Sequence, residues 1–104
     1  MTWTDVHARF DILNDVLDRA AIDPSGAVID TFSTHPDSVR LFGTPEMVLL
    51  ALQARWTNHL NAKYDYAIEK GIDPVWAPQQ LAAEQPALRA VLDRTVLREL
   101  VHAA

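Results

Sequence analysis

Apolar residues recur at helical spacing along most of the chain. In the first segment they stand three or four positions apart, and Thr2 precedes them as a candidate N-cap with Asp5 three positions later. The pattern predicts a helix from residue 3 to about Ala21, which Asp23-Pro24-Ser25-Gly26 ends. Its apolar side spans about half of the helix circumference, which is wide enough to contact two neighbours. The residues on that side are Trp3, Val6, Phe10, Leu13, Leu17 and Ala20.

A second, longer helix has clear signals at both ends. Thr44-Pro45-Glu46 combines an N-cap residue, a proline at the first helical position and an acid in the first turn. The pattern continues to Lys70, where Gly71 and the apolar Ile72 are typical of a glycine C-cap with its hydrophobic contact. At 1.5 Å per residue, a helix over residues 45–70 is about 39 Å long. We therefore expect one central helix to dominate the architecture.

The remaining segments are less regular. A helical pattern covers about Pro78 to His102, but Pro86 lacks a backbone donor and predicts a break near Gln85. Residues 22–43 are compatible with a strand, a short helix or a loop: residues 27–32 could form a short strand but have no partner strand, and residues 36–42 resemble a short helix. The sequence thus predicts one all-α domain over residues 1–104, a small antiparallel helical bundle around the long helix.

Two segments carry more apolar residues than a single helix face can bury. From Met47 to Ala54 only Gln53 is polar, and a helix that is apolar all round is normally buried all round. Near the C-terminus, aliphatic residues fall on the side of the last helix that is polar one or two turns earlier. These surpluses predict a contact with a second copy or another protein. The candidate interface residues are Met47, Val48, Ala51, Ala54, Leu97, Leu100 and Val101.

Charge separates possible partners. The net charge is −5, and an acidic chain lacks the cation excess that drives nucleic-acid binding. Asp11, Asp15 and Asp18 form one stripe on the first predicted helix, which is either an acidic docking face for a basic partner or a solvated face. His7 and Asp11 are spaced as a pair of metal ligands would be. The basic cluster Arg89, Arg94 and Arg98 is interrupted by acids, so a DNA-binding regulator is only a third hypothesis.

Catalytic and metal-binding signals are sparse. The absence of cysteine excludes disulfides, thiolate zinc sites and iron–sulfur clusters. Glu99-x-x-His102 has the spacing found in di-iron carboxylate bundles, but those sites need two such motifs and further glutamates. His59 is compatible with a general base, a haem ligand or a structural histidine. We expect no metal and no cofactor. The alternative is a ligand- or metal-binding bundle, enzymatic or not, that uses His59, Glu99 and His102.

Several apolar, helical segments give the chain a broader resemblance. Residues 41–43, 49–56, 60–63 and 81–93 resemble short helical proteins of unknown function that are common in actinobacteria. The resemblance implies a helical, cytoplasmic bacterial protein, and it brings no activity, cofactor or catalytic residue. The start of the chain does not read as a secretory signal, and its longest apolar run is far below the roughly 20 residues that cross a bilayer. We expect a cytoplasmic, non-enzymatic protein that binds itself, as a homodimer, or another protein, as a regulatory or accessory subunit.

Overall fold

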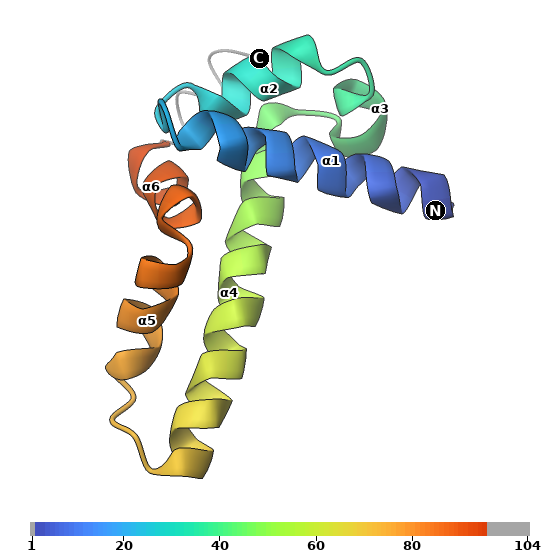
Figure 1. The fold of residues 1–104 in the computed structure, drawn as a ribbon. Coiled ribbons are helices and arrows are strands. Elements are labelled where there is room, and N and C mark those ends of the chain that lie inside the picture. Colours follow the sequence, from blue (N-terminus) through green and yellow to red (C-terminus); the bar gives the residue numbers. More distant parts are fainter. Residues whose placement is uncertain (1, 96–104) are drawn as a thin grey trace.

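The computed structural model describes residues 2–95, and within them the fold is entirely α-helical (Figure 1). A long central helix descends from a layer of shorter helices, and the last two described helices run back beside it. The elements are α1 (Trp3–Ala20), α2 (Ala27–Thr34), α3 (Ser38–Phe42), α4 (Pro45–Lys70), α5 (Trp76–Glu84) and α6 (Pro86–Arg94). The predicted all-α class and the single long helix are confirmed.

The two longest helices begin and end at the signals in the sequence. Thr2 Oγ1 accepts a hydrogen bond of 3.1 Å from the Asp5 amide and caps α1. At the C-terminal end of α4, Gly71 adopts a left-handed conformation with φ of 68°, and the Ile72 amide donates to the Ala67 carbonyl at 2.8 Å. This is the Schellman arrangement, in which a glycine turn satisfies the last carbonyls of a helix. The start of α4 is as predicted, although the Thr44 side chain makes no capping bond.

The break at Pro86 is also confirmed. Gln85, with φ of −130° and ψ of 65°, lies between α5 and α6, so that the residue before the proline leaves the helical region. Its amide still bonds to the Leu81 carbonyl at 2.9 Å, which closes α5. The two short helices together return antiparallel along α4 (Figure 1).

The region that the sequence left open forms two helices. In α2 the buried residues Ala27, Val28 and Thr31 recur at helical spacing, so residues 27–32 form part of a helix and not a strand. A helix satisfies its own backbone hydrogen bonds, whereas a lone strand would leave them unpaired. Gly43, with φ of 83°, ends α3 and turns the chain into α4.

The core lies where α1 crosses α4 and is completed by α2 and the α5–α6 pair. Full burial of one large aliphatic side chain contributes roughly 1.5–3 kcal/mol, so these residues dominate the stability of the fold. The largest fully buried apolar side chains are Ile12, Val16, Val28, Val48, Leu52, Leu81, Leu88 and Val91. Within the apolar run of α4, the chain itself buries Val48 and Leu52, whereas Met47, Leu50 and Ala54 are exposed.

Candidate interaction surface

The N-terminal half of α1 projects beyond α4 (Figure 1). We call residues 3–10 the arm. On one side α3 holds the arm in place: Arg40 Nη1 lies 2.7 Å from Asp5 Oδ1, and Arg9 Nη1 donates to the Leu41 carbonyl at 2.6 Å. The Arg9 guanidinium also lies over the Phe42 ring, 4.3 Å from its centroid. The arm is thus a fixed part of the fold, although no described helix covers its other side.

The uncovered side of the arm is aromatic. Trp3 is 76% exposed and Phe10 is 52% exposed, although both belong to the apolar stripe that predicts the helix. The Trp3 ring contacts the His7 ring edge-on, with 4.5 Å between ring centroids. An exposed pair of large rings on a rigid helix is typical of an interaction site, because such rings bind partners with little loss of conformational freedom.

Beneath the arm, α1 and α4 line an open hollow of about 420 Å³. We call this hollow the corner. Phe10 and Leu13 of α1 form its apolar roof, and the small side chains of Ala51 and Ala54 form its wall on α4. Asn58 continues the same face of α4 one turn further. Small residues on the wall let another helix approach closely.

The charged groups of the corner are two arginines. Arg9 and Arg55 line it together with His59 and the residues above, and no acidic side chain of the described range does. Arg55 Nη1 donates to Asn14 Oδ1 at 3.3 Å, and the guanidinium lies 5.9 Å from the Phe10 ring centroid. Burial lowers the pKa of Arg55, which shows that its charge is partly removed from water. Neither arginine pairs with a carboxylate among residues 2–95. The corner therefore favours a partner that brings negative charge.

The structure divides the predicted interface residues into three groups. Ala51 and Ala54 line the corner, and Met47, half exposed, lies one turn earlier on the same face of α4. Val48 is 0% exposed in the core, so it does not belong to any interaction surface, which corrects its inclusion. Val48 directly follows Met47 in the sequence, and the helical rotation between them turns Val48 onto the face of α4 that α1 and α2 cover. Leu97, Leu100 and Val101 lie outside the described residues.

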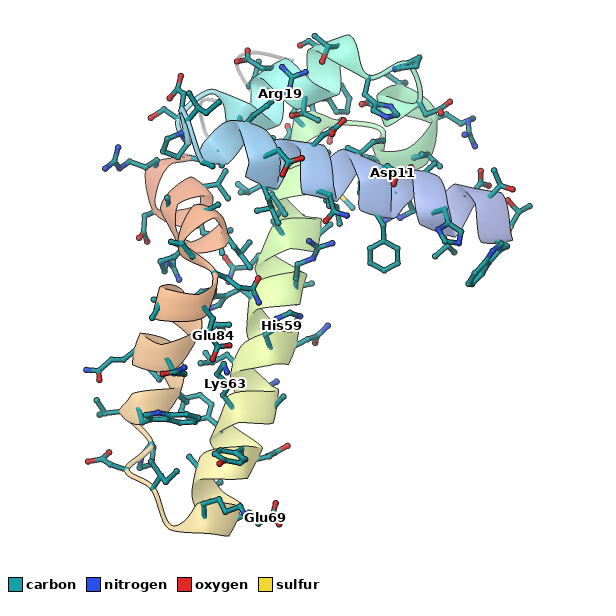
Figure 2. All side chains as sticks on the ribbon, in the orientation of Figure 1. Asp11, Arg19, His59, Lys63, Glu69 and Glu84 are labelled. Atoms are coloured by element: carbon teal, nitrogen blue, oxygen red, sulfur yellow. The ribbon has the colours of Figure 1, made fainter. Side chains whose placement is uncertain are left out.

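The predicted acidic stripe is on the surface. Asp11, Asp15 and Asp18 are exposed along the outer side of α1, and none forms an ion pair with another described residue. Figure 2 shows Asp11 on the arm side of α1, away from the labelled residues of α4. The stripe and the cationic corner are thus neighbouring surfaces of opposite charge on one molecule.

The residues proposed for the alternative functions are dispersed. His59 faces the α5–α6 break, where Gln85 Nε2 donates to His59 Nδ1 at 2.6 Å, and Figure 2 places it one turn above Lys63 and near Glu84. Within residues 2–95 no three His, Asp or Glu side chains gather as a metal site would require. Glu99 and His102 lie outside that range. Arg89 lies over Trp56 at 4.5 Å and pairs with Asp93 at 2.7 Å, so it is occupied by packing within the chain.

A wider hollow between α2 and α3 is a weaker candidate for a site. Its volume is about 710 Å³, and its lining includes Ile29, Phe32, Ser33, His35 and Val39. Among the residues that the structure describes, His35 is its one titratable side chain, and the His35 Nδ1 atom accepts a hydrogen bond of 3.4 Å from the Asp37 amide. A single histidine without an acid or a second base offers no acid–base pair.

The Asp5–Arg40 contact gives a pH-dependent prediction. The hydrogen bond from Arg40 holds the pKa of the Asp5 carboxyl below its usual range. The contact therefore stabilises the fold above the unfolded-state pKa, and this contribution is lost as the pH falls through the lower folded-state pKa. In an NMR titration, Arg40→Ala should raise the Asp5 midpoint, whereas Arg19→Ala, which removes a bond to Thr34 instead, should not. An Asp5 midpoint that Arg40→Ala leaves unchanged would contradict the contact.

The sequence signal for this surface was present but was assigned to the core. The apolar side of α1 is wide enough to contact two neighbouring helices. Along the arm, the described structure places a neighbour on one part of that side and leaves the part with Trp3 and Phe10 exposed. Trp3, Val6 and Phe10 were therefore expected to be buried. Arg9, Arg55 and Asn58 carry no sequence signal, because their grouping depends on the angle at which α1 crosses α4.

No helix among the described residues combines the length and apolar character that are needed to cross a bilayer. Comparison of the chain with models of known protein families, with curated proteins and with solved structures finds no match.

Proposed function

We propose that this chain is a non-enzymatic protein-interaction module that associates with itself through the arm and the corner. The observation that carries this proposal is the exposure of Trp3 and Phe10 on a helix that α3 holds in place. Large apolar groups on a fixed surface cost free energy in water, and contact with a partner removes that cost.

The exposed area supports a modest interface. Trp and Phe side chains bury roughly 150–250 Å² each, so the exposed parts of Trp3 and Phe10 offer about 300 Å² per copy. A standard interface buries about 800 Å² per partner, and the walls of the corner and Met47 add to the aromatic area. The resulting interface is smaller than this standard area. After the cost of association, we expect it to give a dimer with a Kd on the order of micromolar.

The test is the molar mass in solution. Light scattering after size exclusion at about 100 μM, well above a micromolar Kd, should give twice the 11.6 kDa of one chain. Phe10→Lys should shift the protein toward the monomer, because it removes apolar area and adds a third cation beside Arg9 and Arg55. Its helical circular dichroism should not change, since Phe10 is half exposed.

Ile68→Lys is the matched control. Ile68 is exposed on α4, and Figure 1 shows that its end of the helix lies far from the arm. This variant should remain dimeric. A wild-type protein that is a monomer at this concentration would contradict the proposed function, as would equal loss of the dimer in both variants.

A further inference from the structure

We draw no further inference here: the strongest candidate, the corner between α1 and α4 with Arg9 and Arg55 in its lining, belongs to the interaction surface already described, and nothing among the described residues shows what covers it.

Discussion

Leu52→Ala is expected to lower the free energy of unfolding by about 3 kcal/mol, within the range of about 2–5 kcal/mol for removal of a buried leucine side chain. Leu52 is 0% exposed and lies on α4 in the core, where α1 and the last two helices meet. The loss combines the lost burial of apolar groups with a cavity that the neighbouring helices do not fill. Domains of this size are stable by about 5–15 kcal/mol, so the effect is large. Urea denaturation followed by circular dichroism measures it.

Leu50→Ala is the matched control, because it makes the same chemical change two positions away. Leu50 is 51% exposed, on the opposite side of α4. Its loss should cost less than about 1 kcal/mol, since a half-exposed side chain leaves no enclosed cavity. Equal destabilisation by the two variants would show that α4 is covered on both sides.

Gly43→Ala is expected to destabilise the fold by about 2 kcal/mol. Gly43 has φ of 83° and ψ of −57°, a backbone conformation in which a residue with a Cβ atom is strained by roughly 1–3 kcal/mol. No described atom lies within 4 Å of the position that an added Cβ would occupy, so the cost comes from the backbone alone. Because Gly43 directs the chain from α3 into α4, relaxation of this strain would move α3 and its contacts with the arm. Thermal or urea unfolding checks the value.

The other two glycines should give a graded series. Gly71 is left-handed with φ of 68°, where alanine costs about 1–2 kcal/mol, so Gly71→Ala should be intermediate. Gly26 has an ordinary negative φ, and an added Cβ would lie 3.2 Å from the side-chain carboxylate of Asp30, which can rotate away. Gly26→Ala loses a favourable N-cap residue but also restricts the unfolded chain, and these effects nearly cancel. An equal effect at all three positions would contradict the backbone explanation.

The best-predicted parts of the fold are those with local causes. The start of α4 at Pro45, its end at Gly71 and the break at Pro86 each follow from the conformational preferences of one or two residues. Such preferences act whatever the rest of the chain does, so the sequence alone indicates them. The α2 helix is different: its short apolar segment suits a strand as well, and the packing of Val28 and Thr31 into the core distinguishes the two.

The candidate surface required tertiary information that the sequence does not contain. The run from Met47 to Ala54 is apolar on all sides, so its periodicity does not show which side the chain itself covers. The structure covers the side of Val48 and Leu52 and exposes the side of Met47 and Ala54. In the same way, the wide apolar stripe of α1 indicates two neighbouring helices. Because the arm extends past α4, α3 is its one neighbouring helix among the described residues. Val48 is therefore the member of the predicted α4 patch that belongs to the core.

The uneven surroundings of α4 have a consequence for motion. The first half of the helix contacts α1, α2, α3 and α6, whereas its far end contacts α5 alone among the described helices. Helices as short as α5 have little stability of their own. The end of α4 near Lys70 and the neighbouring α5 therefore depend on their contact with each other. Transient local opening should therefore begin near Lys70 and cost far less than global unfolding, with fast amide hydrogen exchange there and slow exchange around Leu52. The corner lies near Leu52, in the half of α4 where exchange should be slow. The end of α4 near Lys70 can therefore fluctuate without disturbing the surface where a second copy would bind.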